Sequence, residues 1–151
     1  MPYTYEYPRP MVTVDMIVHR KNKANQPEVL LIERGKEPYQ GMWALPGGFV
    51  DMDEDLEDAA HRELMEETGI KVELFSQFST YGKPGRDPRG RTVSIVFMTD
   101  IKDENPVLKA GDDASNARWF SMQALPELAF DHTHILEEFL KCGFNLPCLS
   151  G

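Results

Sequence analysis

The stretch from Gly48 to Ile70 holds the densest set of side chains that could carry out chemistry. Its 23 residues include nine acids, and Arg62 is its single lysine or arginine. An acidic run is most often a solvated helix face. On a helical wheel, however, the apolar face of this segment continues into glutamates. The residues that fall within about 100° of one another on that wheel are Leu56, Ala59, Ala60, Glu63 and Glu67.

Glutamates that face inward need a positive partner. Loss of hydration costs on the order of several kcal/mol per ion, and the last turns of a helix add about 0.3–1 kcal/mol of unfavourable dipole interaction each. One arginine cannot neutralise three glutamates, whereas a hard divalent cation with oxygen ligands can. Glu63 and Glu67 are therefore candidate metal ligands, and Glu66 lies beside Glu63. The Gly47 carbonyl could join them, although Gly47-Gly48 alone would be a simple turn.

A basic loop provides a second candidate site. Residues 82–91 hold four cations and one acid, in a protein whose net charge is −9. The simple alternative is a solvated loop, but arginine forks match phosphate oxygens in bidentate fashion. We interpret the loop as the wall that binds a terminal phosphate or a ribose. The arginines concerned are Arg86, Arg89 and Arg91.

His132 is a third candidate, since it follows an aromatic and an acidic residue in Phe130-Asp131-His132. It could contact a phosphate or the edge of a base. The alternative is a structural histidine, with Asp131 serving as a helix cap.

These residues need a scaffold of strands and helices. Alternating apolar residues predict a half-buried strand over 11–20, and Asp53 and Gly69 are suited to begin and end the acidic helix. Further strands are expected at 28–34, 71–81, 92–101 and 117–121, with loops at 82–91 and 102–116 and a final helix at 132–141. Residues 1–10 read as an extended arm of one α/β domain that spans residues 1–151.

Composition excludes several classes of protein. With 151 residues and 41% hydrophobic residues, the chain suits one globular domain. A net charge of −9 argues against binding to nucleic acid or to an anionic membrane. The sequence has no long apolar segment, and the two cysteines, Cys142 and Cys148, are expected as free thiols. These features favour a cytoplasmic protein.

The acidic stretch resembles the Nudix box. Gly48, five residues, Glu54, seven residues and then Arg62-Glu63-Leu64-Met65-Glu66-Glu67-Thr68-Gly69-Ile70 match that motif at every fixed position. Nudix hydrolases cleave nucleoside diphosphates that are linked to another moiety. The resemblance implies an α/β/α sandwich with a mixed sheet. It also implies Glu63, Glu66 and Glu67 as ligands of Mg²⁺ or Mn²⁺, with Gly47 in addition, Arg62 as the residue that orients them, and Glu54 as its partner.

The loop sequence YGKPGRDPRGRTVS, with a proline soon after the box, is similar to Nudix enzymes of the bacterial ADP-ribose pyrophosphatase type. This resemblance implies hydrolysis of ADP-ribose to AMP and ribose 5-phosphate. The alternatives are a house-cleaning pyrophosphatase for nucleoside triphosphates and a regulator that senses ADP-ribose without hydrolysing it. The expected partners are a small nucleotide substrate and, as a possibility, a second copy of the chain in a homodimer.

The family also implies a further acid in a later loop, as general base or extra metal ligand. In this sequence Asp113 is the first choice and Asp112 the second.

Overall fold

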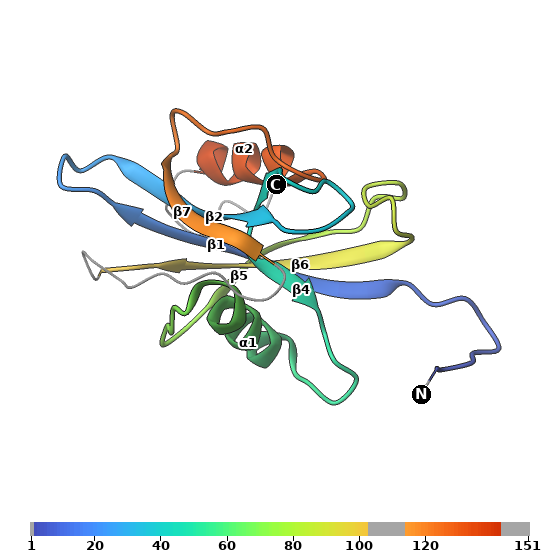
Figure 1. Cartoon of the computed structure of the whole chain (residues 1–151). Helices are drawn as coiled ribbons and strands as arrows, with labels where there is room; N and C mark the ends of the chain where they lie inside the picture. The colour runs from blue at the N-terminus through green and yellow to red at the C-terminus, as the bar shows by residue number, and fades with distance from the viewer. Residues whose placement is uncertain (1, 103–113, 143–151) are drawn as a thin grey trace.

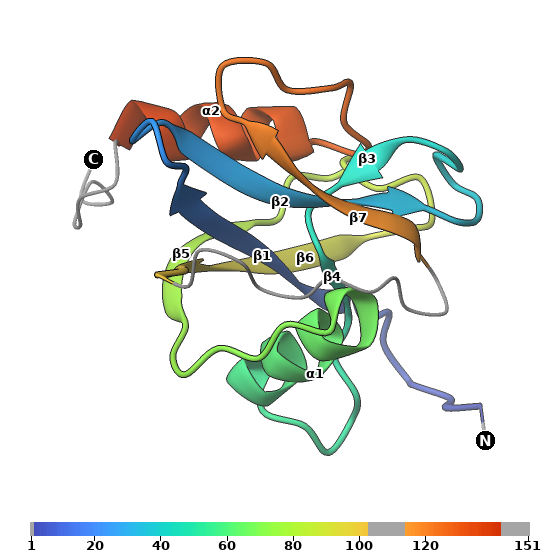
Figure 2. The same cartoon turned by 60° about the vertical axis from the view of Figure 1, so that its left-hand side comes forward.

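A mixed β-sheet lies between two helices (Figure 1). The computed structural model of the protein describes residues 2–102 and 114–142. The strands are β1 (Met11–Lys21), β2 (Pro27–Arg34), β3 (Trp43–Ala44), β4 (Gly47–Phe49), β5 (Ser76–Tyr81), β6 (Thr92–Asp100) and β7 (Ala114–Ser121). The helices are α1 (Leu56–Thr68) and α2 (His132–Cys142), and Figure 2 shows them on opposite faces of the sheet. This arrangement confirms the predicted α/β/α sandwich.

Strand β1 is the centre of the sheet, whose order is β3-β2-β1-β6-β5. It runs parallel to β6 and antiparallel to β2 and β4, so the sheet is mixed as predicted. Residues 13–18 are all buried, and the prediction of a half-buried strand is therefore wrong. A central strand covered by helices on both faces has no solvent side. A polar residue such as Asp15 on this strand is therefore not part of a solvent-exposed face, and it is a candidate for a functional site.

The sheet splits beside β1. Strand β2 pairs with residues 19–21 of β1, whereas the short strand β4 pairs with residues 13–15. Strand β2 continues away from β1 and pairs with β3 and β7. The split exposes backbone and side chains of β1, β2 and β4 to a common space, which is where the cavity described below lies.

Each helix packs on its own apolar cluster. The cluster on the α1 side contains Val14, Met16, Val18, Ala59, Ala60 and Leu64. The cluster on the α2 side contains Ile17, Val29, Leu31, Ile135, Leu136 and Phe139. Two separate cores hold the helices in place on the two faces of β1, and so the acidic face of α1 is fixed relative to the sheet.

Several predicted boundaries need correction. The N-cap of α1 is Asp55, whose carboxylate accepts a hydrogen bond from the Leu56 backbone, and not Asp53. Gly69 ends the helix as predicted, with a φ of 76°. Strand β5 begins at Ser76 rather than at residue 71, and β7 begins at Ala114 rather than at residue 117. The loop over 82–91 has no regular structure, as expected.

Residues 2–10 form neither helix nor strand, and their side chains are exposed. Within residues 2–102 and 114–142, no helix is both long and apolar enough to cross a membrane. Cys142 is disulfide-bonded, which contradicts the expected free thiol at that position. Cys148 lies outside the described residues.

Candidate active site

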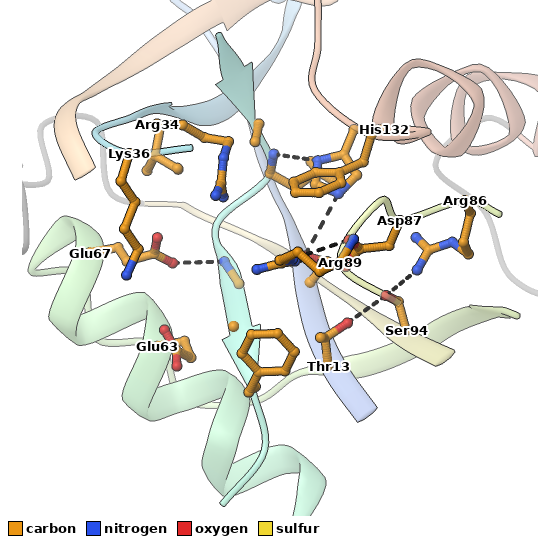
Figure 3. Close-up of a pocket in the computed structure, with 18 of the residues that line it drawn as sticks. Thr13, Arg34, Lys36, Glu63, Glu67, Arg86, Asp87, Arg89, Ser94 and His132 are labelled. Carbon is orange, nitrogen blue, oxygen red and sulfur yellow. Dashed lines mark hydrogen bonds and ion pairs between the residues drawn. The ribbon is translucent and has the colours of Figure 1, made fainter. Parts of the chain in front are cut away.

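The split in the sheet forms a cavity of about 260 Å³, shown in Figure 3. Its walls come from β1, β2, β4, α1, the loop between β5 and β6, and the segment that leads into α2. The polar and charged residues that line it are Thr13, Asp15, Arg34, Lys36, Asp51, Arg62, Glu63, Glu67, Arg86, Asp87, Arg89, Ser94 and His132. Residues far apart in the sequence thus meet at one site.

Helix α1 contributes two carboxylates to the cavity. Glu63 and Glu67 are one turn apart and both line it, as the helical phase predicts. Glu67 is buried, with 7% of its surface exposed. The side chain of Glu66 is 57% exposed, and Glu66 does not belong to the cavity lining. The inward-facing carboxylates are therefore Glu63 and Glu67.

Burial makes both of these carboxylates hard to ionise. It raises the pKa of Glu67 to about 8, although the Gly47 backbone N–H donates a 2.7 Å hydrogen bond to Glu67 Oε1. Burial also raises the pKa of Glu63, while its hydrogen bond to Arg62 acts in the opposite direction. Two desolvated carboxylates side by side are a place where a cation would be strongly stabilised.

The two glycines of β4 make room for carboxylates. A side chain at residue 48 would collide with the Glu63 carboxyl group, and one at residue 47 would collide with the Asp15 carboxylate and the Val14 carbonyl. Neither glycine has a left-handed φ. The requirement at these positions is close approach of the backbone to acidic side chains, rather than a special turn geometry.

Arg62 fixes one side of the acidic face. Its Nε donates to Glu54 Oε2 at 2.6 Å, its Nη1 to Glu63 Oε1 at 2.9 Å, and its Nη2 to the Phe49 carbonyl at 3.1 Å. A longer contact of 3.3 Å joins it to Glu66 Oε2. The bond to Arg62 lowers the pKa of Glu54 and keeps that carboxylate charged. These contacts hold the Arg62 guanidinium between Glu54, Glu63 and the β4 backbone.

The donor set suits a cation that takes only part of its ligands from protein. Within residues 2–102 and 114–142, no cluster of three or more histidine, cysteine, aspartate or glutamate side chains could form a complete metal site. Mg²⁺ and Mn²⁺ are commonly bound by one or two carboxylates together with waters and ligand phosphate oxygens. Glu63 and Glu67 fit that pattern, while Glu66 does not line the cavity.

The three arginines predicted to bind substrate have different positions. Arg89 lines the cavity, with its guanidinium 4.8 Å from the Phe49 ring and 5.1 Å from the Phe130 ring. Asp87 accepts hydrogen bonds from Arg89 Nε at 3.1 Å and Nη2 at 2.8 Å. Arg91 does not belong to the lining, and its Nη1 donates to the Gly82 carbonyl.

Arg86 also lines the cavity, but the side chain is only 5% exposed and its donors are engaged. Its Nε and Nη2 donate to the two oxygens of Asp131 at 2.8 and 2.7 Å, and its Nη1 donates to Ser94 Oγ at 2.7 Å. Asp131 therefore anchors this loop to the segment before α2. A helix cap was one alternative that the sequence left open for Asp131, whose carboxylate binds Arg86 in the structure.

Two cations that the sequence analysis missed face the acidic residues. Arg34, at the end of β2, and Lys36, just after it, both line the cavity. Arg34 Nε donates to the Pro38 carbonyl at 2.6 Å, and its guanidinium lies 5.0 Å from the Phe130 ring. Lys36 points toward Glu67 in Figure 3. In the sequence, the signal for these two residues was a pair of cations at the end of an apolar strand.

His132 and Asp15 form the floor of the cavity. The Leu45 backbone N–H donates to His132 Nδ1 at 3.0 Å, and His132 Nε2 lies 3.8 Å from Asp15 Oδ1. Burial lowers the pKa of His132 and raises that of Asp15. Asp15 was not among the residues predicted from sequence, although one acid inside a strongly apolar strand was a signal for it. Asp113 and Asp112 lie outside the described residues.

A family model described as NUDIX domain matches residues 9–140. The chain belongs to the Nudix family. It is 44% identical over 135 residues to an ADP-ribose pyrophosphatase of Methanocaldococcus jannaschii, and the match covers 89% of this chain and 76% of that protein. It is also 37% identical to the ADPR responsive transcriptional repressor NtrR of Acinetobacter baylyi, over 88% of this chain and 54% of the repressor.

Among solved structures, a bifunctional NMN adenylyltransferase/ADP ribose pyrophosphatase from Francisella tularensis, in complex with AMP and a manganese ion, has a TM-score of 0.76 and 30% identity. The similarity covers 92% of this chain and 44% of that one. The chain thus spans about half the length of the repressor and of the bifunctional enzyme.

Proposed function

We propose that this protein is a metal-dependent diphosphatase that hydrolyses ADP-ribose to AMP and ribose 5-phosphate. The observation that carries this proposal is the pairing of opposite charges across one cavity. The buried carboxylate of Glu67 and the partly buried carboxylate of Glu63 lie on one side of it. Arg34, Lys36 and Arg89 also line it. A diphosphate with bound cations needs both kinds of partner, because the cations bind carboxylates and the phosphate oxygens bind arginine and lysine.

Glu63 and Glu67 would hold the cation, together with the Gly47 carbonyl, and we propose Mg²⁺ or Mn²⁺. Glu66 becomes a further ligand if it exchanges its contact with Arg62 for the metal. When bound, such a cation neutralises charge on the diphosphate and lowers the pKa of a coordinated water. The manganese in the Francisella enzyme supports this choice of metal. Arg62 keeps Glu63 in position through its hydrogen bonds to Glu63 and Glu54.

The cationic wall would bind the phosphates and restrict their orientation. Arg89 is held between two rings and a carboxylate, so it is preorganised to meet an anion. Arg86 is committed to Asp131 and Ser94, and we propose that it shapes the floor rather than binding phosphate directly. Arg91 does not line the cavity, and so it gains no support as a substrate ligand.

A second candidate function is binding of ADP-ribose without hydrolysis, as part of a regulator. The 37% identity to the Acinetobacter repressor favours it. The two candidates share the cavity and differ in whether ADP-ribose survives incubation with the protein.

The test is a substrate screen with purified protein and Mg²⁺ or Mn²⁺. We expect ADP-ribose to give AMP and ribose 5-phosphate with a higher kcat/KM than any nucleoside triphosphate. Tight binding of ADP-ribose with no product would favour the regulator. Preferred release of inorganic pyrophosphate from nucleoside triphosphates would favour the house-cleaning alternative.

A further inference from the structure

Two buried polar side chains in the cavity have no part in the proposed cation site or the cationic wall. Asp15 lies on the central strand β1, and His132 is the first residue of α2. They are 8% and 3% exposed, respectively, and both line the cavity. Burying a carboxylate in the middle of a sheet is costly. A role in ligand binding would explain why this strand carries an aspartate.

The hydrogen bond to Leu45 determines which nitrogen of His132 carries the proton. Because the Leu45 backbone N–H donates to Nδ1 at 3.0 Å, Nδ1 has a lone pair and no proton. The neutral ring then carries its proton on Nε2, which is the nitrogen that faces Asp15 Oδ1. The floor of the cavity therefore presents one donor, His132 Nε2–H, next to one acceptor, the Asp15 carboxylate.

The spacing of this donor and acceptor leaves room for a third group. Their separation of 3.8 Å is too long for a direct hydrogen bond. A single hydroxyl oxygen can bridge it, accepting from His132 and donating to Asp15 at about 2.8 Å from each. Phosphate oxygens fit less well, because an ionised phosphate only accepts hydrogen bonds and has no proton to donate to the Asp15 carboxylate. The geometry thus selects a neutral group that both donates and accepts.

The other polar groups around the pair form one network, and Ser94 in that network also interacts with the Asp15 carboxylate. Arg86 donates to Asp131 and to Ser94. Ser94 Oγ in turn shares a hydrogen bond with Thr13 Oγ1.

The pair lies next to the proposed diphosphate site. Only the backbone of Gly47 separates Asp15 from Glu67, because the Asp15 carboxylate fills the space beside the Gly47 α-carbon and the Gly47 N–H donates to Glu67. In a nucleoside diphosphate sugar, the first hydroxyl groups beyond the diphosphate belong to a ribose, whereas the base lies farther away. We propose that Asp15 and His132 bind a ribose hydroxyl of the substrate, with Asp15 as acceptor and His132 Nε2–H as donor. This inference rests on the proposed function.

The structure offers a matched control for this pair. His19 Nδ1 and Asp100 Oδ1 are also 3.8 Å apart, and neither residue lines the cavity. Asp15→Asn and Asp100→Asn therefore make the same chemical change in two carboxylate–imidazole pairs, of which only one belongs to the proposed site. His132→Asn is a second test variant, because its amide oxygen can still accept from Leu45 while the donor toward Asp15 is lost.

The experiment measures kcat/KM for ADP-ribose and for analogues that each lack one ribose hydroxyl. We expect the wild type and Asp100→Asn to discriminate against one analogue by about tenfold to a hundredfold, the effect of one hydrogen bond to a charged group. Asp15→Asn and His132→Asn should discriminate less than about threefold, with the loss appearing mainly in KM. Thermal unfolding of each variant checks that it is folded.

Three results would overturn the inference. One is that the wild type treats all deoxy analogues like ADP-ribose, which would mean that a water occupies the gap. A second is that both variants keep the full discrimination. A third is that the variants instead lose discrimination between ADP-ribose and its inosine counterpart, which would assign the pair to the base. Absence of ADP-ribose turnover in the wild type would refute the proposed function itself, and is distinguishable from all three.

Discussion

Replacing Glu67 by glutamine should change how the stability of the metal-free protein depends on pH. Glutamine has nearly the same shape and retains an oxygen that can accept from the Gly47 N–H, which donates to Glu67 at 2.7 Å. It removes only the ability to ionise. The comparison therefore isolates the cost of a buried charge at this position.

The magnitude follows from the raised pKa of Glu67, which burial moves from an ordinary value of 4.5 to about 8. Between these two values the folded protein retains a proton that the unfolded chain has released, so stability falls as pH rises. Each pH unit costs about 1.4 kcal/mol, and the total reaches about 4 kcal/mol by pH 8. Glu67→Gln lacks this loss, and we expect it to be the more stable protein at pH 8.

The assay is urea unfolding at pH 5, 6, 7 and 8 with a chelator present. Other buried groups also have shifted pKa values, since burial raises the pKa of Asp15 and lowers that of His132. They are common to both proteins, so the quantity to follow is the difference in unfolding free energy. A difference that stays flat from pH 5 to 8 would refute the assignment of Glu67 as a buried, desolvated carboxylate. Saturating Mn²⁺ should stabilise the wild type more than the variant.

Two further predictions concern the walls of the cavity. Gly48→Ala places a methyl group against the Glu63 carboxyl group, and we expect its turnover to fall at least about tenfold. The control is Met52→Ala, on the exposed neighbouring loop. Equal turnover of the two variants would contradict the role given to Gly48. Arg89→Ala should raise KM for ADP-ribose by about tenfold or more, because one charge-assisted contact is lost. Arg91→Ala should change KM less than about threefold. A larger effect at Arg91 would restore it as a substrate ligand.

Features that depend on local sequence were predictable. The acidic face of α1 follows from helical periodicity, and Glu63 and Glu67 both point into the cavity as that phase predicts. Gly69 ends the helix because a left-handed φ of 76° favours glycine. The N-cap was misplaced by two residues, since several aspartates precede α1 and any of them could cap it. Asp55 is the one whose carboxylate reaches the Leu56 backbone.

Features that depend on how the sheet splits were not predictable. Asp15 looked like one polar position on a half-exposed strand, and only the burial of both faces of β1 shows that it belongs to the cavity. Arg34 and Lys36 reach the site because β2 stops pairing with β1 and diverges from it, and β4 pairs with the remaining part of β1 instead. Arg86 was predicted to bind a phosphate or a ribose, and its partner Asp131 lies 45 residues away in sequence. Such pairings are set by tertiary structure.

The central claim is that the inward carboxylates of α1 serve a metal-dependent reaction on ADP-ribose. The most direct measurement is the rate of AMP release at saturating Mn²⁺ and Mg²⁺ by the wild type, by Glu67→Gln and by the control Glu57→Gln. Glu57 lies on the exposed first turn of the same helix. We expect Glu67→Gln to lose more than about a hundredfold in turnover, and Glu57→Gln to retain it. Near-normal turnover by a folded Glu67→Gln would contradict the account.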